Sequence, residues 1–468
     1  MCIRDSSDVQ SLAGNSRPLP LRATQTGFAI PTLARTGLPL TLGPNIVIEQ
    51  PPIVLTEPHG SFIAQRQENN LGTVRVAGVF DTALSDSVQI RAVEIDGGAA
   101  SAWQTVPSTN GQFSSDIEYP AGWYQIEARS INGGETMHST STIRPIGVGE
   151  IFVVAGQSNS ANSGLPTTAP EDDRVLALND NQTWELAADP QPLATGTGGS
   201  PWPAFGDLLA EQLDVPIGIA SVGWGGTSVQ EWLPGADGPD VGPLYDRLGD
   251  VLRELGPGGA RAILWHQGET DALNETDQET YAAQLSEVIA QSRTDAGFEI
   301  PWGVALAAFQ PQNPTDANAV ILDAQRDVIR DDPLVFAGPN TDLLGPELRF
   351  DNVHFNEEGL RVHGSLWFDA VQPLFASGEF LVADFDEDGT VNSADFEFLS
   401  SLFGEHVNPP GAAPDIDGSG IVDFADFLVV SSTFGQSAGT TASVPEPTTP
   451  LFFVLGVLFL LRACGRRS

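Results

Sequence analysis

The sequence predicts an α/β protein with a doubly wound parallel sheet, preceded by a β-sandwich and followed by a small α-helical domain with calcium loops. Three observations support this prediction. Residues 147–376 alternate strand-like and helix-like segments, residues 53–146 hold short strand-like runs between turns, and residues 382–436 hold an internal repeat. A chain of 468 residues is also too long for a single core, so several domains are expected.

The charge balance excludes several classes of function. The chain has 61 acidic and 21 basic residues, a net charge of −40 and no lysine. Nucleic-acid binding needs a basic face, and a lysine Schiff base or a Walker-type phosphate loop needs lysine. The two cysteines, Cys2 and Cys464, lie at opposite ends of the chain, so we expect no disulfide framework, no CxxC metal site and no catalytic cysteine.

Residues 1–52 are expected to be an N-terminal linker or the remnant of an upstream segment. Residues 16–52 are rich in Pro, Leu, Thr and Gly and show weak periodicity. Residues 1–15 lack a basic region followed by an apolar one, so no signal peptide is visible.

Residues 53–146 are predicted to form a β-sandwich of immunoglobulin or fibronectin type. Gly-containing turns at 96–98, 110–111 and 132–134 separate the strand-like runs. Such a domain either binds carbohydrate or braces the next domain, and the lack of a clear aromatic platform favours bracing. The predicted runs are 61–65, 72–79, 87–95, 102–106, 122–129 and 139–144.

Residues 147–376 are predicted to form a parallel sheet with helices on both faces. Short β-branched runs predict strands, and longer segments of helical periodicity separate them. The predicted strands are 151–155, 216–222, 260–266, 302–308 and 334–337, and the predicted helices are 204–213, 244–255, 279–293, 317–330 and 357–371.

Residues 382–436 contain two EF-hand-like calcium loops, 384–395 and 415–426, with a period of 31. Each loop has oxygen side chains at positions 1, 3 and 5, Gly at position 6 and a carboxylate at position 12, a spacing that wraps oxygens round one Ca²⁺ ion. Ser419, at position 5 of the second loop, is a weaker ligand. An acidic surface loop is the simpler alternative. The candidate ligands are Asp384, Asp386, Asp388, Thr390, Asn392, Asp395, Asp415, Asp417, Ser419, Ile421, Asp423 and Asp426.

This repeat resembles a type I dockerin, in which each loop is followed by a helix. The resemblance implies structural Ca²⁺ in both loops and a cohesin-like protein partner. A calcium-stabilised spacer is an equal alternative.

Residues 437–468 form a tail of three parts. A small-residue linker is followed by Val-Pro-Glu-Pro at 444–447, an apolar run at 450–461 and a basic end. The run is short for a stable membrane span. The layout resembles a PEP-CTERM sorting signal, which implies export to the surface or exterior of a Gram-negative bacterium, transient membrane insertion and cleavage by an exosortase. A plain hydrophobic anchor is the alternative, and either implies that the natural N-terminus is missing or replaced here.

Four polar turns follow predicted strands of the α/β domain, at 156–160, 221–227, 265–271 and 351–354. Ligands of open α/β sheets bind at the carboxyl ends of the strands, so these turns predict the active site. Ser158 is a candidate nucleophile, and a serine needs a base. Asp351 and His354, three residues apart, place a carboxylate beside Nδ1 of the imidazole and leave Nε2 free to take the serine proton.

Acyl transfer also needs hydrogen-bond donors for the oxyanion. The candidate donors are the N–H groups of Ser158 and Gly225 and the side-chain amide of Gln267. Trp224 and Trp232 either stack on a sugar or belong to the core. Glu269 is a pocket acid or orients a neighbour, the second being favoured, and His266 is more readily structural than catalytic. The pocket candidates are Gln157, Asn159, Trp224, His266 and Glu269.

These turns resemble the blocks of the SGNH (GDSL-like) hydrolases, and among them the sialate O-acetylesterase-like group, carbohydrate esterase family 6. The motifs are GQSN at 156–159, GGTS at 225–228, HQGE at 266–269 and DNVH at 351–354. The resemblance implies a flavodoxin-like fold, Ser158 as nucleophile, His354 as base, Asp351 as its orienter, and Gly225 and Gln267 as oxyanion donors. The third block differs from the Gly-x-Asn-Asp of the broad superfamily, which leaves the roles of Gln267 and Glu269 open.

The absence of a GxSxG elbow and the proximity of Asp351 to His354 argue against an α/β-hydrolase. We therefore expect a secreted serine esterase that removes O-acetyl groups from sialic acid or from a polysaccharide such as acetylxylan, without a catalytic cofactor. The alternatives are a non-catalytic surface protein that binds carbohydrate, and an esterase for other esters.

Overall fold

The computed structural model describes residues 52–58, 60–95, 98–142, 144–236, 243–313, 315–375, 383–385, 390–407, 413–416 and 418–436. The tail and all but the last residue of the predicted N-terminal linker lie outside this range, as do the candidate calcium ligands Asp386, Asp388 and Asp417. Among the described helices, none combines the length and apolar character that crossing a membrane requires.

The α/β part is built on the strands of one mixed sheet, in the order β12-β11-β13-β10-β14-β15-β16. All neighbours on this path pair in parallel except β12, which is antiparallel to β11. The order of β13, β10, β14, β15 and β16 is the flavodoxin-like 2-1-3-4-5. The short strands β11 and β12 at one end of this sheet were not expected. The bounds are β10 Ile146–Gly156, β11 Val175–Leu178, β12 Trp184–Leu186, β13 Ile217–Ser221, β14 Ala262–His266, β15 Trp302–Leu306 and β16 Val335–Asn340.

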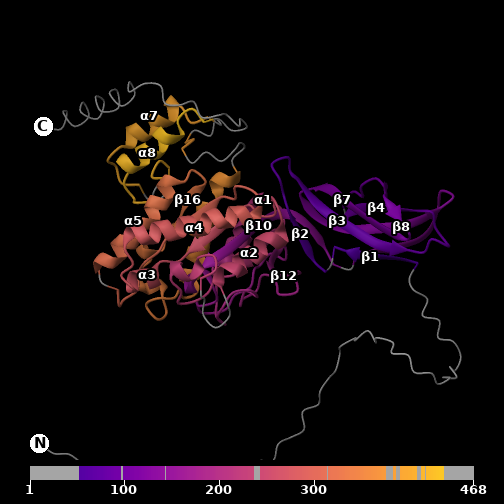
Figure 1. Ribbon diagram of the computed structural model, residues 1–468, viewed down its shortest axis with the longest axis horizontal. Helices are drawn as coiled ribbons and strands as arrows, with labels where there is room; N and C mark the ends of the chain where they lie inside the picture. The colour runs from indigo at the N-terminus through magenta and orange to yellow at the C-terminus, as the bar shows by residue number, and fades with distance from the viewer. Residues whose placement is uncertain are drawn as a thin grey trace, which may run out of the picture. The chain divides into compact units, whose positions relative to one another are not determined.

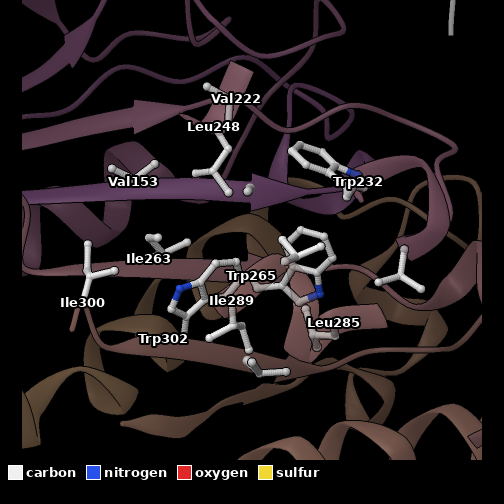
Figure 2. Packing of buried hydrophobic residues seen from close by; sticks show 14 of the residues in the cluster. Val153, Val222, Trp232, Leu248, Ile263, Trp265, Leu285, Ile289, Ile300 and Trp302 are labelled. Carbon is white, nitrogen blue, oxygen red and sulfur yellow. The ribbon is translucent and has the colours of Figure 1, made fainter. Parts of the chain in front are cut away.

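Helices cover both faces of this sheet, which runs from magenta to orange in Figure 1. Val153 belongs to one buried cluster, whereas its neighbours Phe152 and Val154 belong to another, because successive strand residues point to opposite faces. The first cluster contains apolar residues of α2, α4 and α5, and Figure 2 shows Trp232, Trp265 and Trp302 within it. The second contains residues of α1 and α6. The bounds are α1 Trp202–Leu213, α2 Leu244–Leu255, α3 Glu269–Leu273, α4 Gln278–Ala296, α5 Thr315–Asp331 and α6 Glu357–Ala370.

The β-rich part has two layers. Strands β1, β3, β7 and β6 form one sheet, whereas β2, β4, β5, β8 and β9 connect to the sheet that contains β10. Inward-facing residues of β3, β4 and β8, such as Val74, Ile90 and Ile126, share one buried cluster. The assignment to an immunoglobulin or fibronectin type stays a prediction. The bounds are β1 Ile53–Glu57, β2 Phe62–Gln65, β3 Leu71–Phe80, β4 Ser87–Glu94, β5 Gln104–Val106, β6 Ser108–Thr109, β7 Gln112–Pro120, β8 Gly122–Asn132 and β9 Glu135–Ser141.

Strand β10 belongs to both parts. Its residues 146–149 pair with β2, and those at 146–148 also pair with β8. From Glu150 onward the same strand pairs with β13, and from Phe152 with β14. All eleven of its residues are buried. The expected domain boundary between residues 146 and 147 therefore falls inside one continuous strand.

A buried ion cluster marks the point where β10 changes partners. The Glu150 carboxylate is fully buried and accepts hydrogen bonds from Arg66 Nε at 2.7 Å and Arg261 Nε at 2.7 Å. Gln65 donates to the same carboxylate at 2.8 Å, and its amide oxygen accepts the Ile151 N–H at 2.7 Å. The charge of Glu150 is thus balanced and its oxygens are hydrogen-bonded, as burial requires.

The two repeat copies contain the helices α7 (Ser393–Leu402) and α8 (Phe424–Thr433), which share one apolar core. The carboxylates expected at loop position 12, Asp395 and Asp426, are fully buried and take part in capping boxes at the helix starts. Each also accepts a backbone N–H from the start of its own loop at 2.6 Å. Within the described ranges no cluster of three or more His, Cys, Asp or Glu suits a metal ion, so calcium binding stays a prediction.

Candidate active site

The candidate nucleophile turn begins where β10 ends. Gly156 has a φ of +123°, and a Cβ at this position would lie 2.1 Å from the carbonyl oxygen of His266, so only glycine fits. The Gln157 N–H donates to that carbonyl at 2.8 Å, and the Trp224 N–H donates to the Gly156 carbonyl at 2.8 Å. The ends of β10, β13 and β14 are therefore tied together at this turn.

Ser158 opens a short 3₁₀ turn, Ser158–Ser160, and is 8% exposed. The first N–H groups of such a turn have no partner within it, so the Ser158 N–H can serve an oxyanion. Gly225 borders this residue: a Cβ on Gly225 would lie 3.7 Å from the Ser158 Cβ. The second predicted turn thus lies against the candidate nucleophile.

Asp351 and His354 form the expected pair. His354 Nδ1 lies 2.7 Å from Asp351 Oδ2, and Asp351 Oδ1 accepts the N–H groups of Val353 at 2.9 Å and His354 at 2.7 Å. Burial alone would raise the pKa of Asp351, but the hydrogen bonds from His354 and Val353 outweigh it and lower the pKa below its usual value. The carboxylate is therefore ionised and fixes the imidazole.

Arg349 fixes the loop that carries this pair, and the sequence analysis did not single it out. Its guanidinium donates to the carbonyl oxygens of Val353 and, at 2.8 Å, Thr341, and it lies 4.3 Å from the ring centroid of Phe355. Arg349 is 6% exposed, and burial lowers its pKa. The only signal in the sequence is an arginine two residues before Asp351 in a chain with few cations.

The structure brings Asp351 to His354 but does not join His354 to Ser158. Among the hydrogen bonds of the described residues, none links the Ser158 side chain to this imidazole. Catalytic hydrogen bonds are often absent or long before substrate binds. The Phe350 ring lies beside His354, with centroids 6.1 Å apart and ring planes 27° apart, and is 45% exposed.

Gln267 is engaged elsewhere rather than free for an oxyanion. It is fully buried, and its Nε2 donates to Asp271 Oδ2 at 2.5 Å, to the Thr227 carbonyl at 3.0 Å and to Gln157 Oε1 at 3.2 Å. An amide has two protons, so both are already used. The geometry favours a structural role for Gln267 over the expected role as an oxyanion donor, because its amide joins the third turn to Gln157 in the first turn.

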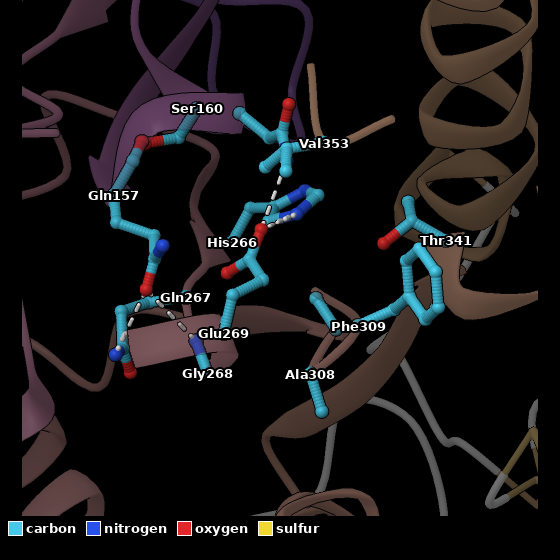
Figure 3. Close-up of polar contacts among 12 residues, drawn as sticks. Gln157, Ser160, His266, Gln267, Gly268, Glu269, Ala308, Phe309, Thr341 and Val353 are labelled. Carbon is cyan, nitrogen blue, oxygen red and sulfur yellow. Dashed lines mark hydrogen bonds and ion pairs between the residues drawn. The ribbon is translucent and has the colours of Figure 1, made fainter. Parts of the chain in front are cut away.

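Gln157, a pocket candidate, belongs to the same network of hydrogen bonds. Its Oε1 accepts the Thr270 N–H at 3.1 Å and the Gly268 N–H at 3.4 Å, and Figure 3 shows it reaching both Gln267 and Gly268. The Gly225 N–H donates to Thr195 Oγ1 at 2.9 Å. An oxyanion that accepts the Gly225 N–H would have to replace the Thr195 hydroxyl. No pattern in the sequence predicted that Thr195 lies beside Gly225.

Asn159, Glu269, His266 and His363 form a buried polar chain behind the turn. Asn159 Nδ2 donates to Glu269 Oε1 at 2.9 Å. His266 Nε2 lies 3.4 Å from the same oxygen, and Figure 3 shows His266 beside Glu269. His266 Nδ1 lies 3.2 Å from His363 Nε2. This arrangement favours the expected roles of Glu269 as an orienting residue and His266 as a structural one.

The protonation states in this chain follow from burial and charge. Burial raises the pKa of Glu269, but the hydrogen bond and charge of His266 and the Asn159 amide outweigh it and lower the pKa overall. Burial, followed by the charges of His266 and Arg349, holds the pKa of His363 well below its usual value. Glu269 is therefore ionised and His363 neutral at pH 7.

The two tryptophans with open roles lie in different places. Trp232 is fully buried, with its ring centroid 5.4 Å from that of Trp265, so it belongs to the core. Trp224 is half-buried, and the Arg247 guanidinium lies 5.0 Å from its ring centroid. Trp224 directly precedes Gly225, so it is the one of the two that borders the nucleophile turn.

Comparison with known proteins concerns this same α/β part. Residues 148–372 match the family model described as carbohydrate esterase, sialic acid-specific acetylesterase. An Arabidopsis thaliana protein described as a "probable carbohydrate esterase" is 29% identical over 196 residues, which are 36% of this chain and 72% of the relative. These matches support a carboxylic ester hydrolase in this part of the chain.

Solved structures with similar folds include carbohydrate esterases. The structure of an Arabidopsis thaliana protein aligns at 24% identity with a TM-score of 0.40, covering 47% of this chain and 96% of the other. A carbohydrate acetylesterase from Xanthomonas citri aligns at 19% identity with a TM-score of 0.45, covering 67% and 72%. A family two carbohydrate esterase from Cellvibrio japonicus aligns at 13% identity with a TM-score of 0.32, covering 69% and 96%.

Proposed function

We propose that residues 148–372 form a serine O-acetylesterase that acts on acetylated carbohydrate. The observation that carries this proposal is the Asp351–His354 pair, 2.7 Å apart, on the loop that follows the last strand of the sheet. The central strand of the same sheet ends at Gly156, two residues before Ser158. A carboxylate-held imidazole and a serine at a strand end are the two components that nucleophilic acyl transfer needs.

The reaction proceeds in two balanced steps. His354 Nε2 takes the Ser158 hydroxyl proton as Oγ attacks the acetyl carbonyl, and the resulting imidazolium returns that proton to the departing sugar oxygen. Water then gives a proton to His354 and attacks the acetyl-enzyme, which releases acetate and restores the serine hydroxyl. Asp351 stays ionised throughout and stabilises the imidazolium.

Backbone donors at the turn serve the oxyanion. Among the described residues the Ser158 N–H has no hydrogen-bond partner, so it is available for this role. The Gly225 N–H becomes available when the oxyanion displaces the Thr195 hydroxyl. The side-chain amide of Asn159 donates one of its two protons to Glu269, and its second proton is a further candidate donor to the oxyanion. Each such donor is worth roughly 3–4 kcal/mol of barrier.

The test is acetate release from acetylated xylan, from O-acetylated sialic acid and from a long-chain ester. We expect hydrolysis of at least one acetylated sugar, loss of that activity in Ser158→Ala, and full activity in Ser163→Ala, a control in the same loop. Hydrolysis of none of the three esters would refute the enzyme assignment, and preference for the long-chain ester would refute the substrate class. Unchanged rates in Ser158→Ala would refute the site.

We also propose that the protein is exported, that the repeats bind Ca²⁺ as a structural ion, and that they serve a cohesin-like partner or act as a spacer. The support is the sequence pattern of the repeats and the tail. Calorimetric titration of the full chain with CaCl₂ tests the metal loops, and absence of heat at millimolar calcium would refute them.

A further inference from the structure

An outward-facing group of side chains on the β-rich part has no role in the proposed esterase. Outward residues of β4 and β8 alternate with buried ones, and the register places Gln89 opposite Arg129 and Arg91 opposite Glu127. Trp103, directly before β5, lies over this group. We call these five residues, Gln89, Arg91, Trp103, Glu127 and Arg129, the Trp103 face.

Two guanidinium groups lie against the same indole ring. The Arg129 guanidinium carbon is 4.1 Å, and that of Arg91 4.5 Å, from the Trp103 ring centroid. All three side chains are partly exposed. A planar apolar ring held beside two cations is the kind of surface on which a charged sugar ring can stack.

Both arginines are hydrogen-bonded along one edge, and within the described part of the chain the other edge of each guanidinium has no hydrogen-bond partner. Arg91 Nε donates to Glu127 Oε2 at 2.7 Å. Arg129 Nε and Nη2 both donate to the amide oxygen of Gln89, at 3.0 and 2.7 Å. A guanidinium has five N–H donors, so each keeps several for a ligand in an already fixed orientation.

The hydrogen-bond partner of Arg129 is neutral, the side-chain amide of Gln89. The protein has 61 acidic residues for 21 basic ones, yet no ion pair joins Arg129 to a carboxylate among the described residues. A positively charged, oriented guanidinium without a carboxylate partner is suited to an external anion, and carboxylates fit its planar fork.

A cavity continues this face along the strands. It has a volume of about 290 Å³ and is lined by Val93, Gln125 and Arg144, together with Glu94, Ile95 and Pro145. Val93 and Gln125 are paired in the register and lie two residues beyond Arg91 and Glu127 on the same strands, so they form the next outward row. The volume approaches that of small-ligand pockets, and the lining adds a third cation, Arg144, together with one carboxylate, Glu94.

We propose that the Trp103 face and this cavity form a binding site for a polysaccharide that carries carboxylate groups, such as one containing uronic or sialic acid residues. The indole takes a sugar ring, the free edges of Arg91 and Arg129 take a carboxylate, and the cavity takes the next sugar of the chain. The site is separate from Ser158 and needs no esterase activity. Binding is expected to weaken with salt, because it depends on exposed charges.

The experiment measures retention of the full chain in gels that contain polygalacturonate, with neutral dextran as the comparison polymer. We expect retention by polygalacturonate only, at least tenfold weaker in Arg129→Gln and Trp103→Ala and partly kept in Arg129→Lys, which retains the charge but not the fork. Arg75→Gln, which removes an exposed arginine from the other sheet, is the matched control and should bind like the unaltered protein. Ser158→Ala should also bind unchanged, which separates this proposal from the esterase.

Three results would overturn the proposal: no retention, equal retention by dextran, or equal weakening in Arg75→Gln. Thermal melting separates binding from a purely structural stack. If the arginines only brace the sheet, Arg129→Gln lowers the melting temperature and leaves retention unchanged, which refutes the site. Weakened retention at an unchanged melting temperature supports it.

Discussion

One oxygen of Asp351 lies 2.7 Å from Nδ1 of His354, and the other oxygen accepts the backbone N–H of the same histidine at 2.7 Å. The carboxylate therefore holds the imidazole and the turn beneath it at once. A substitution that keeps the size of this side chain but removes its charge tests both functions.

Asp351→Asn should lower kcat for acetate release by roughly 10³–10⁴-fold, because the amide no longer selects the imidazole tautomer or stabilises the imidazolium. Steady-state rates measure this, and Asp369→Asn, on the exposed side of α6, serves as the control that should stay near the unaltered rate. A loss smaller than tenfold would show that His354 does not depend on Asp351.

Gln267→Leu should lower stability more than catalysis. The change leaves Asp271 and Gln157 without their buried amide donor, which costs about 1–3 kcal/mol. Urea unfolding measures the free energy, and kcat per folded molecule should fall less than tenfold. A fall of 10²–10³-fold at unchanged stability would instead identify Gln267 as an oxyanion donor.

Glu150→Gln should lower the free energy of unfolding by about 3–5 kcal/mol, because it leaves Arg66 and Arg261 without their buried counter-charge. Glu57→Gln removes one partner of the exposed Arg75 pair and should cost less than about 1 kcal/mol. Urea unfolding of both variants gives the comparison, and equal losses would contradict the structural role of the cluster.

Stability should depend on pH through His363. Its pKa in the folded protein lies well below the ordinary value of about 6.5, so below pH ~6.5 the unfolded chain binds a proton that the folded chain does not. This contribution is complete above pH ~6.5 and is lost as the pH falls from there toward the folded pKa. His363→Gln should make the slope of unfolding free energy against pH shallower by up to about 1.4 kcal/mol per pH unit in that window. Urea unfolding at pH 5 and pH 7.5 measures the slope, and identical slopes in both proteins would refute this role of His363.

Local patterns predicted the α/β elements because each depends on its own residues. The helix over 244–255 has the bounds of α2, and the five predicted strands overlap β10, β13, β14, β15 and β16. The pairing of Asp351 with His354 was equally accessible, since the two are three residues apart. Strand β7 was missed although Phe113, Ile117 and Tyr119 face inward, because Ser115 interrupts the apolar residues at the inward positions.

Relationships between distant segments could not be read in the same way. Arg261 is 111 residues from Glu150, and Asn159 is 110 residues from Glu269, so no spacing in the sequence signals either contact. The hydrogen bonds from Gln267 to Gln157 and Thr227, and the one from the Gly225 N–H to the Thr195 hydroxyl, also join distant segments. These bonds determine which donors are available to an oxyanion. The contacts of Trp103 are equally hidden from the sequence, because the arginines beside it belong to the strands β4 and β8.

Strand β10 belongs to both the β-rich part and the α/β part, and this affects how the chain unfolds. A strand whose first residues complete one apolar core and whose last residues complete another cannot leave one without disturbing the other. The β-rich and α/β parts therefore have no flexible joint between them at this strand and are expected to melt as one cooperative unit. Recombination at residue 146 would remove from the β-rich part a strand segment that pairs with both β2 and β8, so this part could not be exchanged there without a replacement for that segment.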